Sequence, residues 1–286
     1  MAATYVLPVV RSLVVLMIVV GIFSPLEWFF PLRRGRNGRS EGLLDLGWYL
    51  LNSIGLAFVL GPPAALVAWA VHAVIPAPVT HAAAALPLFP KMALAMLVGE
   101  LGFYWGHRWS HEIPWLWRFH AIHHSATHMT FLVNARAHPV DGVFTRLCGL
   151  VLLYATGLAS PVGAHPTIIP AAVVFGSSIW GYFIHANIRW RLGPLERLVS
   201  SPAFHHWHHT YDDHKDHNYA SMLPVMDMLF GTFHLPPRLP EQYGSATPLP
   251  SGIMGQLIAP FGLSPPPAAP AEGRGAPTGV DPAGRQ

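Results

Sequence analysis

The sequence predicts an all-α integral membrane protein, with about four to five transmembrane or re-entrant helices and a cytoplasmic, histidine-rich helical cap. Of its 286 residues, 52% are hydrophobic and only 11% are charged, whereas soluble domains average roughly 25% charged residues. The apolar residues form long runs, and several of the 18 histidines gather in three short clusters between and after those runs. The composition therefore indicates a membrane protein, and the clusters place polar chemistry at its edge.

The apolar runs give the expected helices in chain order, at residues 13–30, 46–74, 92–105, 147–159 and 168–184. A spanning helix needs about 20 residues. The first run fits this length and is expected to be a retained anchor. The second is too long unless it kinks at Gly61-Pro62-Pro63, and the third is short unless its helix continues through His107. The last two runs predict a spanning or re-entrant hairpin that turns at Pro161 and Gly163.

Positive charge after the first run predicts the orientation. Arg33, Arg34, Arg36 and Arg39 lie there, and loops rich in arginine stay in the cytoplasm. The N-terminus is then outside, and all three histidine clusters reach the cytoplasmic side. We expect residues 1–90 to form an N-terminal membrane hairpin with this basic loop, residues 91–235 to carry the chemistry, and the Pro/Ala/Gly-rich tail at 236–286 to be largely disordered.

Composition also excludes several classes of site. Cys148 is the only cysteine, so neither an intramolecular disulfide nor a thiolate metal site can form within the chain. The formal net charge is only +3, and no arginine-rich stripe with stacking aromatics indicates nucleic-acid binding. A lipid bilayer is the expected surrounding.

The three clusters have the spacing of metal ligands. Histidines three or four residues apart share one face of a helix, whereas adjacent ones diverge by about 100°, which suits two neighbouring metal ions. The segment His107-Arg108-Trp109-Ser110-His111 lacks the His-Glu-x-x-His motif of zinc proteases. Imidazole suits iron, although zinc would bind too. The clusters are His107 and His111; His120, His123 and His124; and His205, His208 and His209.

The residues around these histidines resemble the fatty acid hydroxylase/sterol desaturase superfamily over roughly 100–233. The motifs are Tyr104-Trp105-x-His107-Arg108-x-x-His111, Phe119-His120-x-x-His123-His124-Ser125 and Ser201-Pro202-x-Phe204-His205-x-x-His208-His209, followed by Asn218-Tyr219-Ala220 and Asp227-x-x-Phe230-Gly231-Thr232. Two positions depart from the family pattern, which often has Asp where Glu100 stands and Trp where Met226 stands.

The resemblance implies a non-haem di-iron enzyme that uses O₂ to hydroxylate or desaturate a C–H bond of a membrane lipid such as a sterol, hopanoid or fatty acyl chain. Zinc could replace the two Fe ions in purified protein. The eight clustered histidines are the implied catalytic ligands, with His185 as a ninth metal ligand. No haem-binding or flavin-type motif occurs in the sequence, so a separate electron-transfer protein and reductase are expected.

Metal-bound histidines usually donate their second ring proton to an acceptor. Glu100, seven residues before His107, is the leading candidate for such a partner, and His138, Asp141, Asn218 and Asp227 are further ones. Two other functions stay open at this point. A carotenoid hydroxylase uses related histidine motifs, and a non-catalytic membrane protein could keep the site to store or sense metal.

Overall fold

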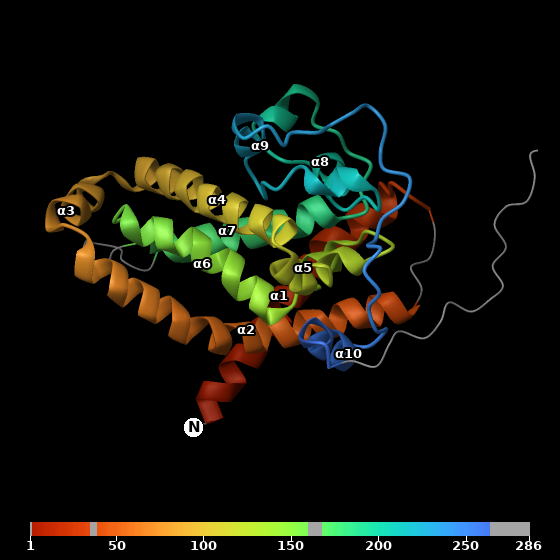
Figure 1. Ribbon diagram of the computed structural model, residues 1–286, viewed down its shortest axis with the longest axis horizontal. Coiled ribbons are helices and arrows are strands. Elements are labelled where there is room, and N and C mark those ends of the chain that lie inside the picture. Colours follow the sequence, from red (N-terminus) through yellow and green to blue (C-terminus); the bar gives the residue numbers. More distant parts are fainter. Residues whose placement is uncertain (1, 35–38, 160–167, 264–286) are drawn as a thin grey trace, which may run out of the picture.

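The computed structural model describes residues 2–34, 39–159 and 168–263, and within these ranges the fold is helical, as the sequence predicts. Two isolated β-bridges, Pro31–Ile188 and Thr210–Tyr243, are the extended pairings found there. The long helices are α1 (Ala2–Phe29), α2 (Arg39–Val74), α4 (Leu88–Glu112), α6 (Pro139–Ala155) and α7 (Ile168–His185). The helices α2, α4, α6 and α7 run alongside one another, α1 crosses behind them, and a cap of short helices lies over α4 and α7 (Figure 1).

Short elements connect and cap these helices. α3 (Ala77–Ala85) joins α2 to α4, and α5 (Pro114–His120), η1 (His123–Ser125) and η2 (Phe131–Ala135) join α4 to α6. The cap comprises η3 (Gly193–Arg197), α8 (Pro202–His208), η4 (Asp213–Asp216) and α9 (Val225–Leu229). The chain then returns along α2 as α10 (Ile253–Ile258) and η5 (Ala259–Phe261).

Glycines let α4 and α6 approach closely. A Cβ added to Gly102 would lie 2.4 Å from the carbonyl oxygen of Cys148, and one added to Gly149 would lie 3.1 Å from that of Gly99. Small residues at such contacts allow helix backbones to pack closely. The α4–α6 pair supports the site, because α4 carries His107 and His111 and the first turn of α6 carries Asp141.

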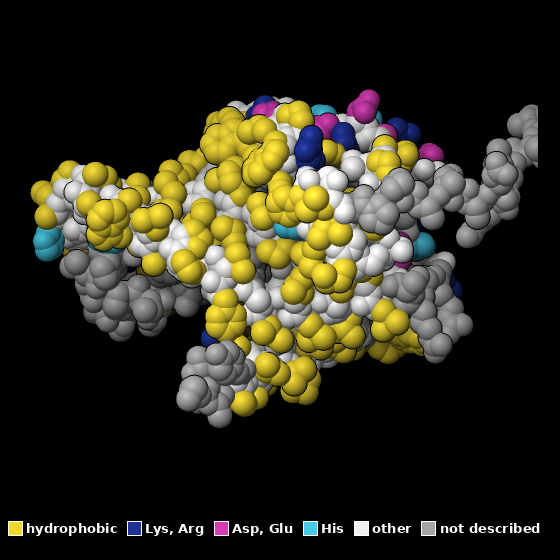
Figure 2. Space-filling view, turned by 60° about the horizontal axis from the view of Figure 1, so that its bottom comes forward, with side chains coloured by type: hydrophobic (Ala, Val, Ile, Leu, Met, Phe, Trp, Pro, Cys, Tyr) yellow, Lys and Arg dark blue, Asp and Glu magenta, His cyan; other side chains and the backbone are white. Residues whose placement is uncertain are grey.

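The apolar helices fit a membrane protein only in part. Within the described residues, one helix, Val6–Phe29, is long and apolar enough to cross a membrane, and a bent pair, Glu41–Gly55 with Phe58–Val74, could form a second span. Hydrophobic side chains cover the surface of the long helices, and charged ones gather over the cap (Figure 2). Four to five spans therefore remain a prediction.

α2 bends at a different place from the one that the sequence predicts, whereas α4 extends as far as predicted. We placed a kink at Gly61-Pro62-Pro63, but the 44° bend lies between Gly55 and Phe58. A proline disturbs the carbonyl four residues before it, so the distortion from Pro62 falls one turn earlier. The helix begun at 92–105 continues to Glu112, as the short third run required. The turn expected at Pro161 and Gly163 lies outside the described residues.

The described part of the 236–286 tail, up to residue 263, includes α10 and contacts α2. Trp48 on α2 donates a buried hydrogen bond of 2.9 Å to Gln256 on α10. Gln256 also donates to the carbonyl of Pro250. These bonds fix the segment against α2, because buried polar groups need their partners. Residues 264–286 lie outside the described part of the chain.

Candidate metal centre

Nine histidines from four parts of the chain meet under the cap. The end of α4 supplies two, the α5–η1 segment three, the last residue of α7 one, and α8 with its C-cap three. Proline begins α5 and α8 at their first turns, and the Ser201 side chain caps α8 by accepting from Phe204 N–H. Both short helices thus start at defined positions, which fixes where their histidines point.

The nine imidazoles divide into two groups, each with ligand atoms within 4.8 Å of one another. His123 and His124 fall in different groups, and so do His208 and His209. This division is what the divergence of adjacent residues predicted. The five-histidine group is His107, His111, His120, His124 and His208, and the four-histidine group is His123, His185, His205 and His209.

One part of the local geometry differs from our expectation. We assigned His120 and His124 to one helix, but α5 ends at His120, and His123 and His124 lie in the 3-10 turn η1. The tighter turn still brings His120 and His124 into one group. His185, which only the family resemblance suggested as a ligand, belongs to the four-histidine group. Its Nε2 lies 3.0 Å from the Nε2 of His205.

The hydrogen-bond partners of the five-histidine group indicate how its rings are oriented for a cation. His107 Nδ1 lies 2.7 Å from the carbonyl oxygen of Tyr219, and His120 Nδ1 lies 3.0 Å from Asp141 Oδ2. Both oxygens only accept, so each Nδ1 carries the proton and each Nε2 is left with a lone pair. These two Nε2 atoms face each other at 3.1 Å. Lone pairs this close repel unless a shared proton or a metal ion lies between them.

The four-histidine group shows the same arrangement. His123 Nδ1 donates to the carbonyl of Arg136 at 3.1 Å, and His185 Nδ1 donates to that of Gly181 at 2.6 Å. Their unprotonated Nε2 atoms are 3.2 Å apart. Two nitrogens that bind one ion at about 2.1 Å and at right angles lie about 3 Å from each other, so both groups fit a metal ion.

Burial adds a second sign of metal binding. The Nε2 atom of His111 is buried and lacks a hydrogen-bond partner among the described residues, which costs free energy unless an ion or another group binds it. Burial, and then neighbouring imidazoles, holds the pKa of His124, His208 and His209 well below 6.5. These rings are therefore neutral at neutral pH, which is the form that binds metal.

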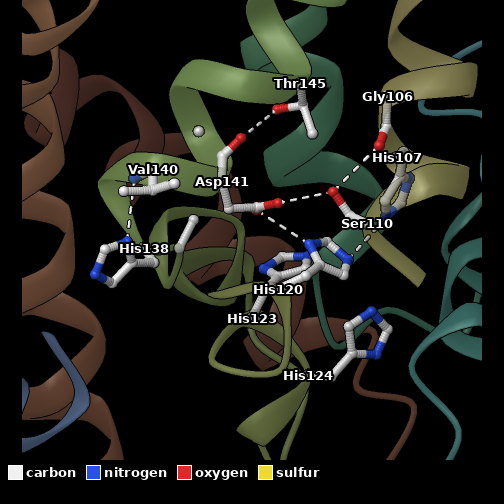
Figure 3. Close-up of polar contacts among 12 residues, drawn as sticks. Gly106, His107, Ser110, His120, His123, His124, His138, Val140, Asp141 and Thr145 are labelled. Atoms are coloured by element: carbon white, nitrogen blue, oxygen red, sulfur yellow. Dashed lines mark hydrogen bonds and ion pairs between the residues drawn. The ribbon is translucent and has the colours of Figure 1, made fainter. Parts of the chain in front are cut away.

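Asp141 is the expected partner that contacts a clustered histidine directly. One carboxylate oxygen accepts from His120 Nδ1, and the other accepts from Ser110 Oγ at 3.1 Å (Figure 3). Asp141 is only 6% exposed. Its carboxylate fixes the orientation of the His120 ring and links α6 to α4.

Asn218 and Asp227 do not contact the clustered histidines. They hold the backbone segments whose carbonyls do. The carbonyls of His217 and Tyr219 accept from His208 and His107. Asn218 lies between them with φ of 59°, a left-handed conformation that asparagine tolerates. Its side chain donates to the carbonyl of Phe204 on α8, and the Asp227 carboxylate accepts from the N–H groups of Tyr219 and Ala220. Both side chains therefore position the carbonyls rather than the histidines.

The structure places Glu100 and His138 away from the metal ligands. Glu100 accepts from the N–H groups of Met222 and Leu223, because seven residues of helix put it about 10 Å from the level of His107. His138 caps α6 by accepting from Val140 N–H at 3.1 Å (Figure 3). We therefore correct the expectation that either side chain contacts a clustered histidine.

Comparison with known proteins agrees with this geometry. The family model described as "Fatty acid hydroxylase" matches residues 92–232, which include all nine histidines. Through this segment, 141 of the 286 residues, the chain is similar to the fatty acid hydroxylase family.

Relatives within this family carry names of lipid enzymes. The chain is 34% identical over 177 residues to ornithine lipid hydroxylase OlsE of Rhizobium tropici, covering 61% of this chain and 51% of the relative. It is 30% identical over 141 residues to alkylglycerol monooxygenase of Danio rerio (49% and 30%), and 28% identical over 152 residues to putative Delta(7)-sterol-C5(6)-desaturase 2 of Arabidopsis thaliana (52% and 50%). The chain thus spans about half or less of the length of these relatives. No solved structure matches it significantly.

Sequence reasoning missed several partners of the clustered histidines. His111 Nδ1 lies 3.0 Å from a carboxylate oxygen of Asp216, and the other missed partners are backbone carbonyls. Asp216 lies in an acidic stretch after the third cluster, which is the only signal that could have indicated it. Backbone carbonyls leave no signal in a sequence, because every residue has one.

Proposed function

We propose that the chain is an O₂-dependent, non-haem di-iron oxidoreductase that hydroxylates or desaturates a C–H bond of a membrane lipid. The observation that carries the proposal is the pair of buried histidine groups, five and four, whose unprotonated Nε2 atoms face each other. The hydroxylase, monooxygenase and desaturase names of its relatives support the reaction class.

Each histidine group would hold one iron. Together the two irons would supply activation of O₂ and removal of a hydrogen atom from the lipid. The chain's own residues provide the surroundings of that reaction. Asp141 holds His120, the carbonyl of Tyr219 holds His107, and the buried ligands keep bulk water from the centre.

Iron rather than zinc, and electrons from a separate electron-transfer protein and reductase, belong to the same proposal. Imidazole binds both metals, but only iron has the redox chemistry that C–H oxidation requires. We also propose that the site faces the cytoplasm. Arg33 and Arg34 follow α1, in agreement with the positive-inside rule, while Arg36 lies outside the described residues.

Neither alternative function is favoured. The named relatives act on lipids, sterols or ether lipids according to their names, which favours a lipid over a carotenoid. A storage or sensing protein would need metal binding alone, whereas these relatives are named as enzymes.

Comparative lipid mass spectrometry tests the proposal. Cells that express the wild type, His208→Ala or His81→Ala are grown with iron and O₂, and a redox partner is supplied. His81 is exposed on α3 and serves as the matched control. A lipid heavier by one oxygen or lighter by two hydrogens should appear with the wild type and the control and vanish with His208→Ala. Indistinguishable lipids from all three, with the wild type folded and loaded with iron, would contradict the proposal.

A further inference from the structure

A pocket of about 490 Å³ is lined in part by Arg136, whose carbonyl oxygen accepts from His123 of the four-histidine group. Its walls come from the start of α2, the segment just after η1, and residues 243–251. Several hydroxyl groups line it, including those of Ser125, Thr127, Tyr243 and Thr247, beside apolar residues such as Leu44 and Leu249. The hydroxyl groups can hydrogen-bond a polar group of a ligand.

Arg136 connects this pocket to the metal centre. It lines the pocket, is 1% exposed, and accepts from His123 Nδ1 through its carbonyl oxygen. Its Nε donates to Asp45 at 2.6 Å and its Nη1 to Ser125 at 3.4 Å, but Nη2 has no partner among the described residues. An unpaired buried guanidinium nitrogen is costly, and a bound anionic group would satisfy it.

Glu41 supplies the opposite charge on the same wall. One carboxylate oxygen accepts from Thr127 Oγ1 at 2.8 Å, and the other lies 3.7 Å from His128 Nδ1. Its side chain is 25% exposed, so a ligand can reach it. Ser125 contacts Arg136, and Thr127 contacts Glu41. Ser125 and Thr127 are two residues apart in the chain, so their Cα atoms lie at most about 7 Å from each other.

Among the described residues that line the pocket, Glu41 and Arg136 are the charged ones. Asp45 already pairs with the Nε of Arg136, so it is the unpaired Nη2 that can take an anionic group, while the carboxylate of Glu41 can take a cationic one. A zwitterion with both charges a few carbons apart complements the wall.

We propose that this pocket binds the headgroup of the lipid substrate, and that the headgroup is a zwitterion whose ammonium faces Glu41 and whose carboxylate faces Arg136. This inference rests on the proposed function, since it assigns the substrate class of the same site. Because Arg136 lines the pocket and holds His123 through its carbonyl, a headgroup bound there would leave its acyl chain close to the centre. A free amino acid shares this chemistry, so the test distinguishes the two sources.

Binding to the full-length, iron-loaded protein is measured without O₂, so that no turnover is needed. The probes are Nα-lauroyl-ornithine, which is zwitterionic; N-lauroyl-norvaline, which lacks the ammonium; N-lauroylputrescine, which lacks the carboxylate; and free ornithine. Glu41→Gln removes one charge at nearly constant shape. Glu112→Gln, in the exposed Arg108–Glu112 pair, is the matched control.

The wild type and Glu112→Gln should bind the ornithine probe about tenfold or more tighter than either single-charge probe, the size expected for a charged hydrogen bond. Glu41→Gln should weaken the ornithine and putrescine probes by about tenfold, leave the norvaline probe unchanged and keep its iron.

Equal binding of the three acylated probes would overturn the inference, and so would equal weakening of all three by Glu41→Gln. Free ornithine that binds as tightly as its acylated form would overturn the assignment to a lipid. Selective binding without any oxidised product in an aerobic assay would keep the inference about the headgroup and overturn the proposed activity.

Discussion

The groups that accept the ring protons of the histidines orient the rings for metal binding. The four ring protons on His107, His120, His123 and His185 are all held by oxygen acceptors. Three of those acceptors are carbonyls and one, on Asp141, is a carboxylate. The side chain of Asp141 can therefore be changed by mutation, whereas the carbonyls cannot.

Asp141→Ala should weaken iron binding at the five-histidine group by about 10- to 100-fold, the usual cost of losing a ligand's hydrogen-bond partner. Asp141→Asn should lose less, because an amide oxygen can still accept from His120. Titration with Fe(II) under argon measures both affinities. The four-histidine group should keep its ion, and an unchanged affinity at both groups in Asp141→Ala would show that the carboxylate does not position His120.

Asp45→Ala should destabilise the protein strongly, because it leaves the Nε of buried Arg136 without its 2.6 Å partner. Breaking a buried ion pair from one side costs about 3–5 kcal/mol. Glu112→Ala breaks an exposed pair and should cost at most about 1 kcal/mol. Thermal unfolding in detergent compares the two variants, and an equal effect would refute the structural importance of the buried pair.

The close packing of α4 against α6 holds the histidines and their partner Asp141 in place. His107 and His111 lie on α4, and their neighbour Asp141 lies in the first turn of α6. The spacing of the two helices therefore sets the distance between a ligand and its support. Gly102 allows that spacing, since its position faces the backbone of Cys148.

Gly102→Ala should cost about 1–3 kcal/mol of stability, as overpacking of a well-packed contact does, and should also lower iron content. Gly21→Ala is the control, because a Cβ there meets nothing within 4 Å. It should be neutral or slightly stabilising, since alanine favours helix. Thermal unfolding and iron analysis are run on both variants. If Gly102→Ala behaves like the control, the close packing does not control the site.

At the scale of the whole molecule, the sequence predicted the helical fold and the division of the histidines, but not their supports. Helical spacing is a local property, so the separation of His208 from His209 could be predicted. The role of Asp216 depends on how η4 lies against α4, which a sequence does not reveal. Glu100 shows the same limit. Its spacing from His107 predicts a shared helix face, but its distance along the helix places it against Met222 and Leu223.

The most direct test of the account is the number of irons bound per chain. The protein is reconstituted with Fe(II) under argon and analysed by elemental mass spectrometry, beside His208→Ala and His205→Ala, which change different histidine groups. We expect two irons in the wild type, with His208→Ala weakening one site and His205→Ala the other. A wild type that saturates at one iron, or variants that both weaken the same single site, would contradict it.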